Sequence, residues 1–341
     1  MMYRKLFLSI LAAIALACLL LFRHRTAQGE WRMVHDEGTV FGTLYHAKYL
    51  YDKDLKAELE AELQRVDASL SMFNPQSTVS RINRNETDDA DEMLGEVLRL
   101  SFRINEATGG AFDPTVAPLV NAWGFGYKNG LLPDSTQVDS LLSLVGLRGI
   151  HLQGSRLTKG NPLSVLDFSA IAKGYGADRA AQVLRRHGIK DFMVEIGGEV
   201  VTEGVNGKGE PWRIGIDKPD ESTAAASSGL QDIISLMSGA IATSGNYRNY
   251  YVADGRKIAH TINPLTGYPA QQDILSSTVL APSCAEADAF ATAFMVLGLE
   301  AARQVLQGQP QLEAYFICSD EQGNCRTWHT EGFGKLLEAR D

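Results

Sequence analysis

The sequence predicts an α+β fold in which mixed β-sheets pack against helices. Amphipathic helical segments alternate with short strands, and in the second half of the chain the strands follow one another closely, as in hairpins. The composition is that of a globular protein, since 45% of the 341 residues are apolar and 21% are charged. The sequence shows no internal repeat and no linker between independent domains, so we expect residues 38–335 to form one domain.

The individual elements follow from apolar periodicity and from glycine and proline punctuation. Residues 38–51 alternate as a strand, and residues 55–70 carry apolar side chains at helical spacing. Residues 163–168 predict a buried strand that leads into a helix ended by Gly188. The predicted helices are 55–70, 93–107, 138–145 and 172–187, with two more after residue 280, and the predicted strands are 38–51, 163–168, 192–196, 200–204, 212–216, 233–237, 250–254, 257–262 and 274–280, with a closing hairpin around Gly323.

The first 25 residues predict a signal or membrane anchor that precedes the fold. Arg4 and Lys5 are followed by an apolar run over residues 6–22, which is just long enough to span a bilayer. Three interpretations stay open: an uncleaved anchor, a lipoprotein modified at Cys18, and a protein released after cleavage. In each, residues 26–37 form a polar spacer, and the body lies in the cell envelope on the periplasmic, extracytoplasmic side of the inner membrane.

Charge and cysteine content limit the possible functions further. The formal net charge of -9 and the lack of a basic stripe argue against a nucleic-acid-binding protein. An acidic protein binds phosphate locally, through a metal ion or backbone N–H groups. Cys318 and Cys325 flank a turn-rich stretch, and they form either a hairpin disulfide or two free thiols.

One polar pair stands out in the predicted helix after residue 280. Asp288 and Thr292 are four residues apart among alanines and phenylalanines, so they share one helical face. Burying a carboxylate and a hydroxyl there is costly without a partner. Mg2+ is one suitable partner because it takes oxygen ligands and leaves room for phosphates. The alternative is a pair that is simply hydrogen-bonded inside the core.

Residues 167–176 predict a second candidate feature, a carboxylate at a strand end followed by a helix start. Helix N-termini offer N–H groups and partial positive charge to an anion, and Lys173 adds a cation there. The alternative is an ordinary connection in which Asp167 caps the helix. His260, next to a Pro/Gly turn, is a candidate base or phosphate donor, or a hydrogen-bonded structural residue.

Two glycine-rich segments have both a structural and a functional interpretation. Gly109 and Gly110 allow the backbone to approach a ligand, and the aromatic residues over 123–126 can form a slot for a planar ring. The alternative is a helix stop followed by core aromatic residues. The stretch 195–199 by itself predicts a tight turn between strands.

In combination these segments resemble the ApbE family of FAD:protein FMN transferases, over residues 38–330. No one motif decides this, but nine of them occur in the family's order. They are residues 72–73, 80–83, 110–115, 123–126, 167–174, 197–198, 243–245 and 260–267, and the pair Asp288 and Thr292.

The resemblance implies an ApbE-like fold of two interlocked subdomains with an FAD cleft between them. It also implies Mg2+, held by the backbone carbonyl of Ala170 and the side chains of Asp288 and Thr292. Phe41 replaces a methionine that is frequent in the family, and Phe73 replaces a frequent tyrosine. The FAD contacts implied are Phe41, Phe73, Ala111, Phe112, Asp113, Asp167, Lys173 and Ile262.

The implied reaction is Mg2+-dependent transfer of FMN from FAD to a threonine hydroxyl of a target protein, with release of AMP. His260 is the remaining candidate for the general base, because Asp288 is taken up by the metal. Hydrolysis of FAD to FMN and AMP, and flavin binding without catalysis, are the alternatives.

The partners implied are exported proteins with a Ser/Thr-Gly-Ala-Thr/Ser acceptor site, such as subunits of Na+-pumping NADH:quinone reductase or Rnf complexes. The nearest stretch in this chain, residues 238–241, lacks the acceptor hydroxyl, so we expect no self-modification.

Overall fold

The computed structural model describes residues 31–125, 132–219, 229–246, 250–253, 256–320, 322 and 324–339. The predicted anchor over residues 6–22, with Cys18, lies outside the described residues, as do Gly126 and Gly323. In the part of the chain that the structure describes, no helix combines the length and apolarity needed to cross a membrane.

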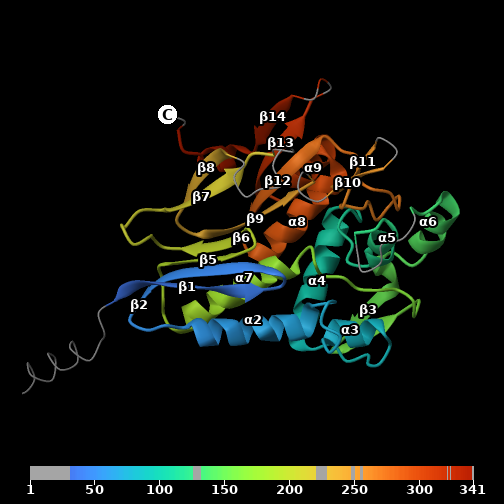
Figure 1. The fold of residues 1–341 in the computed structure, drawn as a ribbon, viewed down its shortest axis with the longest axis horizontal. Coiled ribbons are helices and arrows are strands. Elements are labelled where there is room, and N and C mark those ends of the chain that lie inside the picture. Colours follow the sequence, from blue (N-terminus) through green and yellow to red (C-terminus); the bar gives the residue numbers. More distant parts are fainter. Residues whose placement is uncertain are drawn as a thin grey trace, which may run out of the picture.

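A large antiparallel sheet organises the fold and confirms the predicted α+β class (Figure 1). Eight strands of the described chain pair in it, and each pairing is antiparallel where the sequence predicted a mixed sheet. Figure 1 shows the sheet running from the blue strands β1 and β2 to the red strands β13 and β14. In sheet order the strands are β1 (Arg32–Val40), β2 (Thr43–Tyr51), β5 (Phe192–Ile196), β6 (Glu199–Glu203), β9 (Gly239–Gly245), β12 (Ile274–Ala281), β13 (Glu313–Ser319) and β14 (Cys325–His329).

The chain enters the sheet through a hairpin, where the sequence predicted one strand over 38–51. Strands β1 and β2 join through a two-residue turn in which Phe41 has φ +52° and Gly42 has φ +74°. Both values lie in the left-handed region, which two-residue hairpin turns require. The first described strand therefore begins at Arg32, and residues 32–37 belong to β1 rather than to the predicted spacer.

Helices α2 (Lys56–Leu70), α7 (Ala172–Arg186) and α8 (Cys284–Leu297) pack on one face of the sheet, and α4 (Glu92–Ala107) packs against α2 and α8. Alanines on α7, including Ala177 and Ala181, let the helix approach the buried Tyr45 and Ala47 of β2 closely. Helix α8 is mostly apolar and is buried over most of its length, as expected for a central helix. Burial of each large apolar side chain contributes about 1.5–3 kcal/mol, so this layer dominates stability.

The opposite face of the sheet is covered by a smaller β-structure. Strands β7 (Trp212–Asp217) and β8 (Leu230–Leu236) pair there, and Ile216 and Ile234 pack against Val200, Ile241 and Tyr315 of the main sheet. The short helix α10 (Glu331–Gly334) completes this cluster with Phe333.

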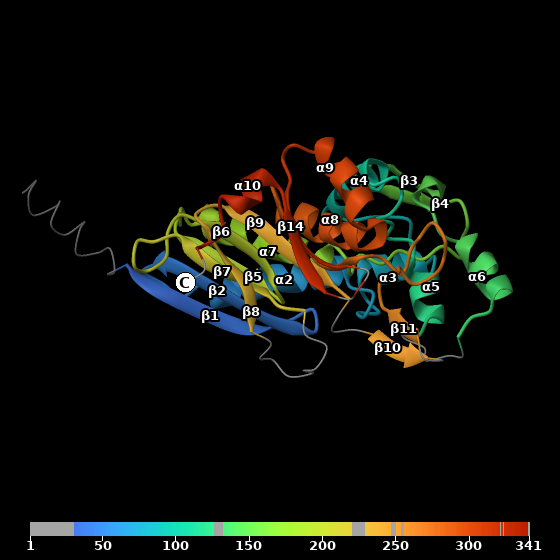
Figure 2. The same ribbon diagram turned by 90° about the horizontal axis from the view of Figure 1, so that it is seen from above.

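A separate lobe lies at the end of the molecule away from β1 and β2 (Figure 2). Its small core joins Leu119, Trp123, Val138, Ile258 and Ile262. The remaining elements of the described chain are α3 (Thr78–Asn83), α5 (Ala117–Ala122), α6 (Ser135–Leu142), the 3-10 turn η1 (Leu147–Gly149), β3 (Ile150–Gln153), β4 (Arg156–Lys159), β10 (Tyr250–Ala253), β11 (Arg256–Ala259) and α9 (Leu299–Gln307).

Among the further differences from the sequence prediction, two concern segments near the sheet and the site. Residues 163–168 run without regular secondary structure, because the Asn83 side chain takes the place of a partner strand: it donates to the Leu166 carbonyl and accepts from the Leu166 N–H. Strand β9 was not predicted, because Gly239–Gly245 is rich in small residues, yet it lies between β6 and β12 in the sheet. Its neighbours determine its conformation more than its own strand propensity does.

Candidate active site

Two adjoining pockets contain all of the site residues predicted from the sequence. The first has a volume of about 400 Å³ and the second about 550 Å³, both within the range of small-molecule sites. Ser169 and Lys173 line both pockets. The first is lined by Ala111, Phe112, Asp113, Asp167, Ala170, Lys173, His260, Ile262, Asp288 and Thr292, and the second by Phe41, Phe73 and Lys173.

A buried charge cluster lies in the first pocket. Lys173 Nζ is 2.5 Å from Glu199 Oε1 and 3.9 Å from Asp288 Oδ1. Burial lowers the pKa of Lys173, but the negative charges of Asp288 and Glu199 outweigh it and raise that pKa above its usual range. Burial raises the pKa of both carboxylic acids, and the negative charge of Asp288 raises that of Glu199 further. The cluster therefore places two buried carboxyl groups beside one ammonium group.

Glu199 was missed as a site residue by the sequence analysis, which treated 195–199 as a tight turn. The turn is present, and it places Glu199 at the start of β6 with its side chain almost fully buried. The structure shows no donor for Oε2 among the described residues. An ionisable side chain at the head of the apolar run Val200–Val201 was the available signal, because such a group is rarely buried without a function.

The starts of α7 and α8 meet at this cluster. A Cβ atom on Gly174 would lie 2.2 Å from the backbone oxygen of Cys284, so only glycine allows this approach. The Gly174 N–H donates to Asp288 Oδ2 at 3.1 Å. One interpretation of the sequence was that N–H groups at this helix start face an anion. The N–H of Gly174 instead donates to Asp288, which is thereby oriented toward the pocket.

The donors in the first pocket fit a magnesium ion. Thr292 lies one helical turn after Asp288 and lines the same pocket, as does Ala170. Thr292 Oγ1 is 3.1 Å from Ser244 Oγ at the end of β9. Oxygen donors and two buried carboxyl groups, one with an oxygen that has no hydrogen-bond partner among the described residues, are features that a hard divalent cation satisfies.

Asp113 and Asp167 line the first pocket but bond mainly to their own loops. Asp113 accepts from the backbone and hydroxyl of Thr115 and from the Leu147 N–H, and burial raises its pKa. Asp167 accepts from the N–H and hydroxyl of Ser169, and burial raises its pKa as well. Asp167 is therefore not the cap of α7, the alternative that the sequence left open. Both carboxylates hold the pocket walls in shape.

The aromatic side chains divide between pocket and core. Phe41 packs closely over Gly176 of α7, where a Cβ atom would lie 2.5 Å from the ring, and Phe73 is 69% exposed at the rim of the second pocket. His260 lines the first pocket, with its ring 6.3 Å from that of Phe125. Trp123 donates to the Gly267 carbonyl within the small lobe, so it is a core residue, as in the alternative interpretation.

The described cysteines form no disulfide bond. The three described cysteines, Cys284, Cys318 and Cys325, all carry free thiols. In the closing hairpin, Cys318 pairs with Arg326 and Cys325 with Ser319, so the two cysteines are not opposite each other.

The sequence and the fold together place the chain in a known family. The family model described as "ApbE family" matches residues 41–316, and the chain belongs to that family.

Relatives and solved structures agree on the class. The chain is 36% identical over 321 residues to the FAD:protein FMN transferase of Vibrio cholerae serotype O1, covering 91% of this chain and 94% of that protein. It is 35% identical to the FAD:protein FMN transferase of Haemophilus influenzae, covering 99% and 100%. The structure of flavin transferase ApbE from Vibrio cholerae superposes with a TM-score of 0.81 at 34% identity, over 90% of this chain and 100% of that one. The apo flavinyl transferase ApbE of Pseudomonas stutzeri gives 0.80 at 31%, over 91% and 98%. The chain is therefore an enzyme of a transferase family.

Proposed function

We propose that this enzyme transfers the FMN moiety of FAD to a threonine hydroxyl of a partner protein and releases AMP. The observation that carries the proposal is Lys173, which lines both pockets at once. FAD has a ring system at each end and a pyrophosphate between them. Two adjoining pockets with a cation where they meet suit such a ligand, because the ammonium group binds phosphate oxygens as a point charge.

In this proposal the two ring systems of FAD, the flavin and the adenine, occupy different pockets. Phe41 and Phe73 offer aromatic faces in the second pocket, and stacking suits a planar ring there. Ala111, Phe112 and Ile262 provide apolar surface in the first.

Magnesium is part of the proposal, held by Asp288, Thr292 and the Ala170 carbonyl. When bound, it supplies Lewis-acid polarisation of a phosphoryl oxygen. Glu199 holds Lys173 in position, and the Gly174 N–H holds Asp288, so both charged groups are oriented before substrate arrives. Such positioning contributes most of the catalysis expected for phosphoryl transfer.

The chemical step is a substitution at the FMN-side phosphorus. The threonine oxygen forms a bond to phosphorus, the bond from phosphorus to the bridging oxygen breaks, and AMP departs with that oxygen. The hydroxyl proton passes to a base, for which His260 is our candidate because it lines the pocket. The acceptor is an exported protein with a Ser/Thr-Gly-Ala-Thr/Ser site, of the type found in membrane redox complexes, and the enzyme acts on the outer side of the inner membrane, held by its N-terminal segment.

Intact mass spectrometry tests the proposal. The full chain in detergent is incubated with FAD, Mg2+ and an acceptor domain that carries the site, and AMP is measured in parallel. We expect the acceptor to gain the mass of FMN and AMP to appear in equal amount, with neither product in EDTA. Asp288→Asn should reduce transfer by roughly 10²–10³-fold, in line with the several kcal/mol that a metal provides. AMP without acceptor modification would establish the hydrolase instead, and no AMP would leave only flavin binding.

A further inference from the structure

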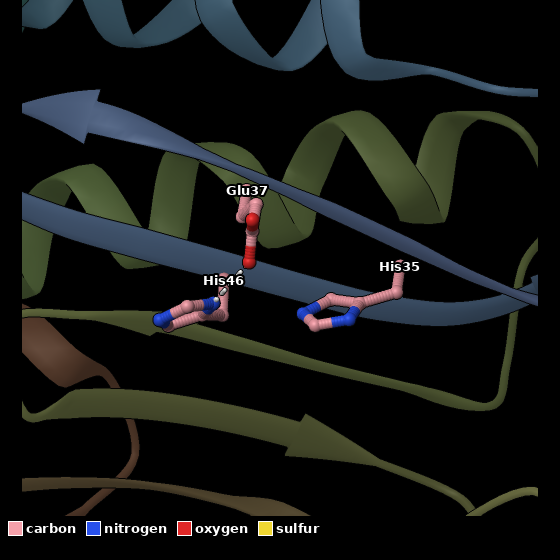
Figure 3. Close-up of side chains that lie close together, drawn as sticks. All are labelled: His35, Glu37 and His46. Atoms are coloured by element: carbon pink, nitrogen blue, oxygen red, sulfur yellow. Dashed lines mark ion pairs between the residues drawn. The ribbon is translucent and has the colours of Figure 1, made fainter.

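Three metal-ligating side chains gather outside the two pockets, on the outer face of the first hairpin. His35, Glu37 and His46 each offer one ligand atom, and these atoms all lie within 4.8 Å of one another. In Figure 3 the Glu37 carboxylate points at His46, and the ring of His35 turns toward the same space. His46 Nδ1 is 3.5 Å from Glu37 Oε2, and the two imidazole rings are 5.7 Å apart.

The strand pairing explains why the three side chains meet. Glu37 of β1 lies directly opposite His46 of β2, and His35 is two residues from Glu37 on the same strand. Side chains two apart on a strand share a face. The other face of the hairpin is buried, with Val34 and Tyr45 packed against α2 and α7, so His35, Glu37 and His46 face away from those helices.

The charged residues beside this cluster carry both signs. Lys48 is paired with His35, which places a positive charge beside the cluster. Glu195 of β5 is paired with His46, which places a second carboxylate on the other side. A divalent cation bound here would have one ammonium and two carboxylates around it, and both imidazoles would bind as neutral ligands.

The ligand set and its spacing suit zinc. Two imidazoles and one carboxylate form a set that zinc sites with an open position use. Zn–N and Zn–O bonds of about 2.0–2.1 Å place tetrahedral ligand atoms about 3.3–3.5 Å apart. Glu37 and His46 already have this separation, and His35 is exposed, so its side chain is free to rotate by the small amount required.

We propose that His35, Glu37 and His46 bind one Zn2+ ion, with water in the fourth position. Ligands from both strands make the ion a clamp across β1 and β2, at the edge of the sheet where the chain enters the fold. An edge strand pairs on one side only, so a cross-strand clamp stabilises it where the sheet cannot. This site is independent of the proposed transferase reaction, because its ligands take no part in either pocket.

A zinc titration tests the site. The full chain in detergent is titrated with Zn2+ against a chromophoric chelator, with Mg2+ and FAD in excess so that the pockets are occupied. We expect one tight site, which weakens at least about tenfold in both His35→Ala and His46→Ala. His151 is an exposed histidine on the strand β3, so His151→Ala serves as the matched control and should bind as the wild type does.

Two further readouts decide the assignment. X-ray absorption of the zinc-loaded wild type should show two imidazole ligands, and one fewer in His46→Ala. Zinc should raise the melting temperature of the wild type and of His151→Ala, but not that of His46→Ala. Absence of a tight site in the wild type, or a tight site unchanged in His35→Ala and His46→Ala, would overturn the proposal.

Discussion

Gly174→Ala offers the sharpest test of how the active site is built. The added methyl carbon would lie 2.2 Å from the Cys284 backbone oxygen, where ordinary contacts begin at 3.4 Å. The starts of α7 and α8 must therefore separate by about 1.2 Å, the difference between those two distances. Neither group can rotate away, since one is a Cβ on a helix and the other is backbone. The separation moves Lys173 relative to Asp288 and stretches the hydrogen bond from Gly174 to Asp288.

The expected effects follow from that displacement. Overpacking of this kind costs about 1–3 kcal/mol of unfolding free energy, and a misplacement of about 1 Å reduces a catalytic rate roughly 100-fold. The free energy is measured by urea denaturation monitored by circular dichroism, and the rate by the growth of FMN-labelled acceptor.

Gly95→Ala is the matched control, because Gly95 is also helical and its nearest neighbour is the Arg99 side chain at 3.4 Å. That variant should gain roughly 0.5–1 kcal/mol and keep its activity. A Gly174→Ala enzyme with unchanged stability and transfer rate would refute the role assigned to this contact.

Three further predictions concern single side chains. Glu199→Gln should keep the metal-free melting temperature at pH 7, because burial already favours the protonated acid, and should weaken Mg2+ binding about tenfold in calorimetry. Phe73→Ala should raise the KM for FAD about tenfold and leave stability unchanged, since this exposed ring contributes about 1–3 kcal/mol by stacking. Burial raises the pKa of Asp178 from 3.8 to about 6, so the stability gained from its protonated form is lost as pH rises through that window. The unfolding free energy of Asp178→Asn relative to wild type should therefore improve by about 2.4 kcal/mol between pH 4 and pH 7, and a flat difference would contradict this.

The residues that the sequence assigned to one site lie together around two adjoining pockets, whereas the sheet was predicted less completely. Asp288 and Thr292 were identifiable because two polar residues one turn apart on an apolar helix are unusual. Local signals also placed α2, α4 and α7, whose apolar faces repeat at helical spacing. The ApbE resemblance supplied the rest, and it assigned Phe41 and Phe73 to a ligand that no local pattern indicated.

Long-range contacts account for what the sequence missed. Residues 163–168 have the composition of a strand, but Asn83 from α3 takes both backbone hydrogen bonds of Leu166. Strand β9 has weak strand propensity and forms because β6 and β12 offer hydrogen bonds on both sides. Glu199 became a site residue only when Lys173 approached from another element. Each outcome depends on a partner distant in sequence, which periodicity does not reveal.

The turn that joins β1 and β2 lowers the stability of the folded enzyme, because one of its residues has an unfavourable backbone conformation. Its first residue, Phe41, has a left-handed backbone that suits asparagine or glycine better than an aromatic residue, and such a conformation costs about 1 kcal/mol or more. The ring is retained against that cost, between α7 and the second pocket. An engineer who introduced asparagine here would gain a more rigid hairpin and lose a wall of the ligand site. A substitution at Phe41 that stabilises the hairpin would therefore weaken ligand binding, and a search for stabilising substitutions should begin elsewhere.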